Sequence, residues 1–163
     1  RPDTTAQRPY DEALVPACEP VGTAPGVRWK AVQGEFPWVA NIDSRKPAEK
    51  GVVPVPGPAA GKGIKKGAML YEGFIDVPQD GAYTFYLSAD GGALLRLHEA
   101  TVVDADYGYK PGTERSGTVQ LRAGLHPFRL YYTRKGNAKP KLDWQWAGPG
   151  ISKQSVPAIR LKH

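Results

Sequence analysis

The chain of 163 residues has a single cysteine and no long apolar run. Cys18 cannot form a disulfide within the chain. It lies in a proline-rich segment away from any pattern of histidine and carboxylate, so we expect a free surface thiol rather than a nucleophile. A membrane helix needs about 20 apolar residues, and the apolar runs here are of strand length. We therefore expect a soluble chain without a membrane partner.

An initiator methionine and a signal-type apolar segment are also missing at the start of the chain, which is Arg1. We expect a processed protein or a piece of a larger one. No basic segment carries the interleaved aromatic residues of an RNA-binding sheet. Residues 57–63, GPAAGKG, have one residue too few between their glycines for a phosphate-binding loop. Nucleic acids and nucleotides are therefore not expected as partners.

Groups suited to catalysis are few. Of the histidines, His98 falls on the outward face of a predicted strand and His126 precedes a proline in a predicted turn, so we expect both at the surface. Asp104 and Asp106 form a close carboxylate pair, but the Tyr-Gly-Tyr sequence that follows them indicates a turn. No nucleophile or metal cluster accompanies these residues. The sequence therefore predicts a protein that is not an enzyme.

Glycine and proline, in contrast, are plentiful, with 19 and 16 residues. Prolines recur through residues 1–25, where they block helix interiors and ladder hydrogen bonds, so this segment is predicted to be an arm or linker. Residues 50–69 combine proline, glycine and lysine and are predicted to form one long surface loop. The 22 Lys and Arg exceed the 16 Asp and Glu by 22 − 16 = +6 charges, which favours anionic partners.

Apolar and polar residues alternate after residue 26 with the period of two that is typical of half-buried strands. The predicted inward-facing sets are Tyr71, Ile75 and Val77; Tyr83, Phe85 and Leu87; Ala93, Leu95 and Leu97; Val119 and Leu121; Phe128, Leu130 and Tyr132; Leu142, Trp144 and Trp146. The turns at residues 78–81, 90–92 and 122–124 are predicted to be hairpins. The pattern predicts an all-β fold, an antiparallel β-sandwich or barrel, with a single domain over residues 26–163.

Trp38 is the best candidate for an exposed aromatic ring that could stack on a sugar, because it lies between Pro37 and Asn41 rather than in a period-two run.

Residues 26–51, 71–106 and 116–161 resemble one known module in order and spacing. They are similar to the PA-fourteen (PA14) domain, which is named after the anthrax protective antigen. The motifs GGALLRLH and VVDADYGY most resemble the variant attached to secreted bacterial sulfatases and related carbohydrate-active proteins. The resemblance implies a β-sandwich or barrel that serves as a noncatalytic accessory domain and, where a ligand is known, binds carbohydrate.

In the lectin-like members of that family, two successive aspartates joined by a cis peptide and an asparagine from a later loop hold a calcium ion that chelates sugar hydroxyls. Asp90 matches the first aspartate and Asn137 matches the asparagine, but Gly91 stands at the second position. Calcium affinity rises with the number of anionic ligands. We therefore expect Asp90 to be a turn residue, with a calcium role as the alternative.

The predicted loop of Asn137 also carries Arg134 and Lys135, whose charges oppose a divalent cation and favour sulfate or carboxylate groups. We predict a noncatalytic carbohydrate-binding module of a larger secreted or cell-envelope protein, such as a sulfatase or glycosidase. An anionic or sulfated polysaccharide would bind through Trp38, Asp90, Arg134, Lys135 and Asn137, and Asp90 and Asn137 are also the candidate metal ligands. The alternatives are a structural domain that docks on a partner catalytic domain without binding sugar, and a calcium-dependent lectin or adhesin.

Overall fold

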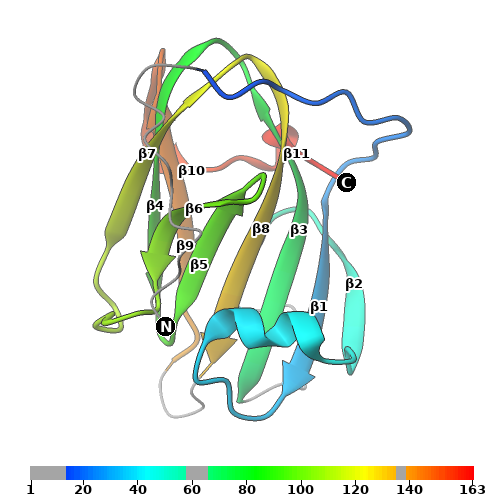
Figure 1. The fold of residues 1–163 in the computed structure, drawn as a ribbon, viewed down its shortest axis with the longest axis vertical. Coiled ribbons are helices and arrows are strands. Elements are labelled where there is room, and N and C mark those ends of the chain that lie inside the picture. Colours follow the sequence, from blue (N-terminus) through cyan, green and yellow to red (C-terminus); the bar gives the residue numbers. More distant parts are fainter. Residues whose placement is uncertain (1–13, 58–65, 135–138) are drawn as a thin grey trace.

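The computed structural model describes residues 14–57, 66–134 and 139–163, whose strands form two antiparallel sheets packed face to face (Figure 1). The large sheet has the strand order β2, β1, β3, β8, β5, β6, and β11 also pairs with β3; the small sheet has the order β10, β9, β4, β7. The large sheet contains β1 (Val27–Gln33), β2 (Glu49–Val53), β3 (Gly67–Val77), β5 (Ala93–Leu97), β6 (Ala100–Ala105), β8 (Gly124–Arg134) and β11 (Leu161–Lys162). The small sheet contains β4 (Gly81–Ala89), β7 (Arg115–Leu121), β9 (Leu142–Gly148) and β10 (Ile151–Ser155). The predicted all-β fold is confirmed, as a sandwich rather than a barrel.

The main core lies between the two sheets and is built by the alternating residues of their strands. Side chains of β4 and β9 stack there: the ring centroids of Tyr83 and Trp146 are 5.7 Å apart. Phe128 of β8 meets Trp144 of β9 across the core, with centroids 4.9 Å apart. The predicted inward-facing sets are all buried. Because large aromatic rings fill the space between the sheets, burial of apolar area is the main source of stability here.

A second core covers the outer face of the large sheet. The short 3-10 helix η1 (Val39–Ser44) lies across this face, as Figure 1 shows. Its buried residues pack with side chains of the strands beneath; the cluster consists of Val32, Phe36, Val39, Ala40, Ile42, Ala68, Leu70, Leu94 and Tyr131. The other 3-10 helix is η2 (Ala158–Arg160). Among the described residues no helix is long and apolar enough to cross a membrane.

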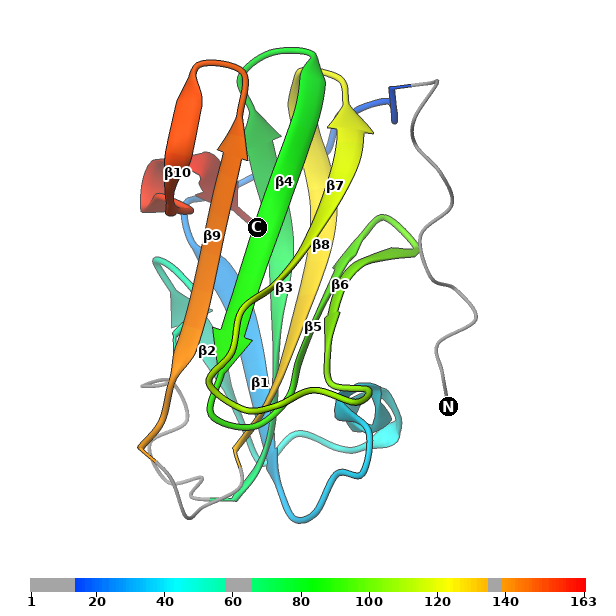
Figure 2. The same cartoon turned by 90° about the vertical axis from the view of Figure 1, so that its left-hand side faces the viewer.

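The three turns that were predicted to be hairpins connect the two sheets instead. The turn after β3 leads into β4, residues 90–92 lead from β4 to β5, and residues 122–124 lead from β7 to β8. In each case the two strands belong to different sheets. Figure 2 shows the small sheet in front of the large one. The prediction was wrong because glycine, proline and aspartate mark where a chain turns but not which sheet the next strand joins.

Two segments that were predicted to be irregular are tied to the sandwich. In residues 14–25 the backbone of Val15 pairs with β7, and the N–H of Cys18 donates to the carbonyl of Leu125 in β8 at 2.9 Å. The Cys18 thiol is free, as expected, but it is half-buried and donates to the same carbonyl; burial raises its pKa. Within residues 50–69 the chain forms most of β2 and the start of β3.

His98 and His126 form a hydrogen-bonded pair, which corrects the expectation that both lie at the surface. His126 is fully buried, and its Nε2–H donates to the Arg122 carbonyl at 2.8 Å. Its Nδ1 must therefore accept the proton of His98 Nε2, also at 2.8 Å. His98 is half-buried in the turn between β5 and β6, with a left-handed φ of 56°. The proline after His126 did not indicate a turn, because residues 124–134 form one strand.

Candidate functional site

Asp90 lies where the chain leaves β4, and its carboxylate joins three parts of the fold. Oδ1 accepts hydrogen bonds from the hydroxyl of Tyr132 in β8 and from the N–H of Lys141 before β9, the latter at 2.9 Å. The N–H of Asp90 donates to the Lys141 carbonyl at 3.0 Å. Burial and the Asp90 carboxylate raise the pKa of Tyr132, so its hydroxyl stays protonated and keeps donating. This arrangement supports the predicted turn role of Asp90.

Gly91 and Gly92 follow Asp90 and leave no room for side chains. A Cβ at Gly91 would lie 2.0 Å from the carbonyl oxygen of Thr133, and one at Gly92 would lie 2.3 Å from Oδ1 of Asp106. The backbone of Gly92 is held in place, because its N–H donates to Thr133 Oγ1 at 2.8 Å and its carbonyl accepts the Thr133 N–H at 2.9 Å. An aspartate at position 91 would therefore require the backbone to move.

These contacts test whether the described residues fit a calcium ion. Gly91 supplies no carboxylate, and one oxygen of Asp90 already accepts two protein donors. The described residues contain no group of three or more His, Cys, Asp or Glu side chains that could hold a metal ion. Calcium takes about six to eight oxygen ligands, several of them anionic. The oxygen donors of the described residues therefore do not fit a calcium ion.

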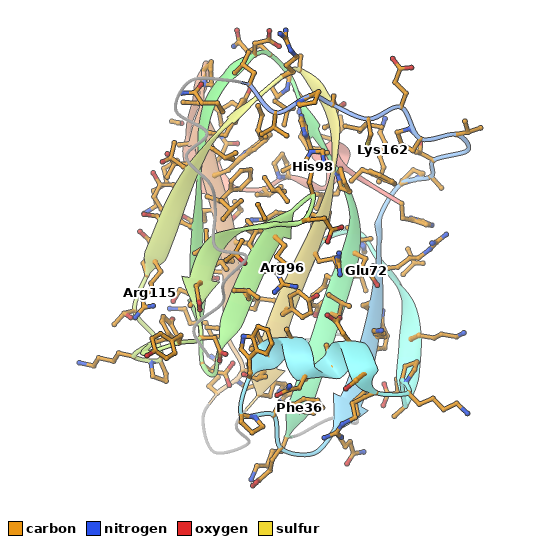
Figure 3. All side chains as sticks on the ribbon, viewed as in Figure 1. Phe36, Glu72, Arg96, His98, Arg115 and Lys162 are labelled. Atoms are coloured by element: carbon orange, nitrogen blue, oxygen red, sulfur yellow. The ribbon has the colours of Figure 1, made fainter. Side chains whose placement is uncertain are left out.

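A pocket of about 360 Å³ opens at the same end of the sandwich, and we name it the loop-end pocket. Phe36 and Pro37 give it an apolar wall, and Figure 3 shows Phe36 below η1. Arg134, at the end of β8, supplies positive charge, whereas Lys66 Nζ forms an ion pair with Glu35 at 2.6 Å. The full lining is Gly34, Glu35, Phe36, Pro37, Lys66, Gly67, Thr133 and Arg134. The pocket can offer a guanidinium group and an apolar surface to the same ligand.

Trp38 directly precedes η1 and is half-buried against the second core. The backbone N–H of Trp38 donates to Oδ1 of Asn41 at 3.2 Å, which fixes the start of the helix. The guanidinium carbon of Arg96 lies 6.0 Å from the Trp38 ring centroid and 5.6 Å from that of Tyr131. Trp38 does not line the loop-end pocket, so the structure does not bring it together with Arg134 there. Its predicted contact with sugar stays a prediction.

Lys135 and Asn137 lie outside the described residues, so their predicted roles in carbohydrate and metal binding stay predictions. Asp104, in contrast, lies in a turn, as the sequence predicted. Its Oδ1 accepts the N–H groups of Asp106 at 2.9 Å and Tyr107 at 3.0 Å, which closes a turn after β6. Asp106 turns toward η1, where its Oδ2 accepts the N–H of Val39 at 3.3 Å. The Asp104 carboxylate thus has the turn role that was predicted for the pair, whereas the Asp106 carboxylate ties this turn to η1.

The family of the chain follows from comparison with known proteins. Residues 67–160, more than half of the chain, match the model of the PA14 domain. The chain belongs to the PA14 domain family. No curated protein matches it. The matched part of this PA14 domain includes Asp90 and Arg134, whereas η1 and Phe36 lie before it. The attachment to a sulfatase that was predicted for the closest variant stays a prediction.

Solved structures with the same fold come from several kinds of protein. An anti-sigma factor domain-containing protein from Clostridium clariflavum is 28% identical with a TM-score of 0.67, over 83% of this chain and 47% of that chain. This chain spans about half the length of that protein and of a second anti-sigma factor domain-containing protein, of which 50% is covered. The PA14 sugar-binding domain from an RTX adhesin is 17% identical with a TM-score of 0.67, over 85% of this chain and 98% of that chain. The epithelial adhesin 6 A domain from Candida glabrata, solved with Galβ1-3GlcNAc, is 14% identical with a TM-score of 0.67, over 90% of this chain and 91% of that chain. The likeness to these two adhesins shows the fold alone.

Sequence reasoning missed Lys66 and Phe36 as neighbours of Arg134. Lys66 belongs to a lysine cluster that was predicted to lie in a surface loop, 68 residues before Arg134 in the chain, since 134 − 66 = 68. The two meet because β3 and β8 pair along their full length, with Gly67 opposite Arg134. The strand periodicities were visible in the sequence, but their register was not, and register decides which loop residues become neighbours.

Proposed function

We propose that this PA14 domain is a noncatalytic carbohydrate-binding module that takes an anionic sugar group in the loop-end pocket. The observation that carries the proposal is the placement of Arg134 beside Phe36 and Pro37 in this pocket. A guanidinium group forms paired hydrogen bonds with carboxylate or sulfate. Pro37 is exposed and suits the C–H face of a sugar ring, whereas Phe36 is only 5% exposed and belongs to the second core. The ligand class is further supported by the sugar-binding domain and the Galβ1-3GlcNAc-bound adhesin domain that share the fold.

We also propose that the domain belongs to a larger secreted or cell-envelope protein, such as a sulfatase or glycosidase, and brings it to a sulfated polysaccharide. The resemblance to the sulfatase-attached variant supports the enzyme context, and the coverage of about half of two anti-sigma factor domain-containing proteins supports only a place in a longer protein. The coding sequence around this segment is the direct test. A neighbouring domain with the catalytic residues of a carbohydrate-active enzyme is the expected result, and a neighbour of any other class contradicts this part of the proposal.

Affinity electrophoresis tests the sugar site. The protein is run in native gels that contain dextran sulfate, with uncharged dextran as the reference matrix. We expect dextran sulfate to retard the protein, and added salt to weaken the effect because salt screens the ionic contacts. In Arg134→Ala the affinity should fall by about tenfold or more, since a hydrogen bond to a charged group contributes about 1.5–3 kcal/mol.

Arg122→Ala is the matched control, because Arg122 is an exposed arginine beyond the opposite end of β8 and its substitution removes the same charge. Equal weakening by both substitutions would mean that dextran sulfate reads only the net charge, which contradicts the assignment to the loop-end pocket. If dextran sulfate does not retard the unmodified protein, the docking alternative gains support. The docking alternative would be tested at the edge strand β2, where Val52 is 53% exposed, and just beyond it, where Val55 is 39% exposed.

A further inference from the structure

A second pocket lies on the outer face of the small sheet, away from the loop-end pocket. It has a volume of about 150 Å³ and lies between β4, β9 and the connection from β6 to β7. Figure 2 shows β4 and β9 side by side on the near face of the small sheet. The lining consists of Tyr86, Leu87, Ser88, Gly112, Glu114, Lys141, Asp143 and Gln145. We name it the sheet-face pocket; none of its residues lines the loop-end pocket.

Ser88 is the unusual residue of this pocket. Its side chain points to the outer face, yet the residue is only 7% exposed, and its Oγ is buried without a hydrogen-bond partner. A neighbouring pair on the same face shows the ordinary situation: the hydroxyls of Thr84 and Thr118 bond to each other at 2.8 Å. A buried hydroxyl without a partner costs about 1–3 kcal/mol, so its presence calls for a ligand or another compensating role.

The charges around Ser88 are already neutralised by lysines. Lys141 Nζ lies 3.7 Å from Oδ2 of Asp143. Lys153 Nζ lies 2.7 and 2.9 Å from the two carboxylate oxygens of Glu114. A charged ligand would therefore find no uncompensated partner among these groups. Their carboxylate oxygens still have free lone pairs, and they can accept hydrogen bonds from hydroxyl groups without a change in net charge.

The size of the pocket and its hydrogen-bonding groups restrict the class of ligand further. A volume of about 150 Å³ corresponds to about five waters, which is the scale of one sugar ring rather than a chain. Gln145 provides an amide that both donates and accepts, and Ser88 provides a hydroxyl that does the same. Tyr86 forms the aromatic side, with Lys153 Nζ 4.4 Å from its ring centroid. The pocket therefore suits a ligand with one ring, no charge and hydroxyl groups in several directions, which describes a neutral monosaccharide unit.

We propose that the sheet-face pocket is a second carbohydrate site, which binds a single neutral sugar unit through Ser88, Asp143 and Gln145. This goes beyond the loop-end site: one end of the domain takes an anionic group, and the face of the small sheet takes an uncharged residue of a glycan. The two sites use different residues, and only the loop-end site depends on an unlike charge in the ligand. A glycan that carries both kinds of residue would be held at two places.

Two-dimensional amide NMR on the ¹⁵N-labelled protein tests the site. Glucose, galactose, mannose and xylose are titrated separately to millimolar concentrations, because one small polar pocket supports binding on the order of millimolar. We expect at least one sugar to shift the amide signals of Ser88, Gly112 and Gln145. In Ser88→Ala the shifts should disappear while the melting temperature stays equal or rises, since the substitution removes an unpartnered buried hydroxyl.

Ser152→Ala is the matched control, because Ser152 is an exposed serine on the neighbouring strand β10. It should leave both the shifts and the melting temperature unchanged. The proposal is overturned if no sugar shifts the pocket amides, if Ser88→Ala keeps the shifts, or if Ser88→Ala lowers the melting temperature, which would mean that water or protein partners satisfy the hydroxyl. Dextran sulfate retardation of Ser88→Ala stays as in the unmodified protein if the two sites are separate, so failure of one proposal is distinguishable from failure of the other.

Discussion

The two outer faces of the sandwich are covered in different ways. On the large sheet, η1 and the side chains beneath it form a second core, and Leu70, Leu94 and Tyr131 under it are buried. On the small sheet, no helix or strand of the described chain packs over the outer face of β4 and β9, which carries polar residues and the sheet-face pocket. The outer face of the large sheet is thus part of a core, whereas no described helix or strand covers the outer face of the small sheet.

The burial pattern along the strands reflects this difference between the two sheets. In β3, residues 67–71 are buried one after another, because both faces of this strand are covered. In β9, buried and more exposed residues alternate from Leu142 to Trp146, because only one face is covered. Continuous apolar runs are typical of strands that are buried on both sides, and alternation is typical of strands with one face in water.

The largest effect is expected where the chain passes from the small sheet to the large one. Gly91→Asp should restore the second aspartate of the lectin-like pattern but destabilise the fold, because the new Cβ would lie 2.0 Å from the Thr133 carbonyl oxygen. Overpacking costs typically about 1–3 kcal/mol, and we expect a loss at or above the upper end. Urea unfolding followed by tryptophan fluorescence measures it.

Gly57→Asp is the control for this prediction. A Cβ at Gly57 meets no atom within 4 Å, and its φ is not in the left-handed region. We expect its free energy of unfolding to stay within about 0.5 kcal/mol of the unmodified protein. If Gly91→Asp were as stable as Gly57→Asp, the tight contact between residue 91 and β8 would be wrong, and the calcium alternative would become testable on that variant.

Much of the fold could be predicted from the sequence, and the site only in part. The alternation of Tyr83, Phe85 and Leu87 is enough to place these three side chains on one face of a strand. The same alternation says nothing about the sheet to which the next strand belongs, so residues 90–92 were wrongly expected to form a hairpin. The helix η1 has only six residues, too few to show a helical period, so the partial burial of Trp38 could not be foreseen.

A smaller difference in the free energy of unfolding is expected between variants of two tyrosines, one on each outer face. The hydroxyl of Tyr131 donates to Oδ2 of Asp43 in η1 at 2.9 Å, and burial and Asp43 raise the pKa of Tyr131 to about 12. Tyr86 contacts Lys153 through its ring, and no described residue forms a hydrogen bond with its hydroxyl. Tyr131→Phe should lose about 1 kcal/mol of unfolding free energy, while Tyr86→Phe should change it by less than about 0.5 kcal/mol. Equal losses in urea unfolding would contradict the view that only the large sheet is covered.

Acid should destabilise the fold through His126 in β8 and His98 in the turn between β5 and β6. Burial lowers the pKa of both groups, and the charge of His126 lowers that of His98 further. The unfolded chain, with a histidine pKa near 6.5, therefore binds protons before the folded one does. The stabilising contribution is fully present above about pH 6.5 and is lost as the pH falls through the lower folded values.

His98→Asn tests this acid sensitivity with little change in shape, since asparagine tolerates the left-handed φ of 56° and its amide can donate to Nδ1 of His126. We expect the unmodified protein to lose unfolding free energy between about pH 7 and pH 5, and His98→Asn to lose less, because one of the two titrating groups is gone. Equal slopes in the unmodified protein and in His98→Asn would contradict the assignment of this acid sensitivity to the histidine pair.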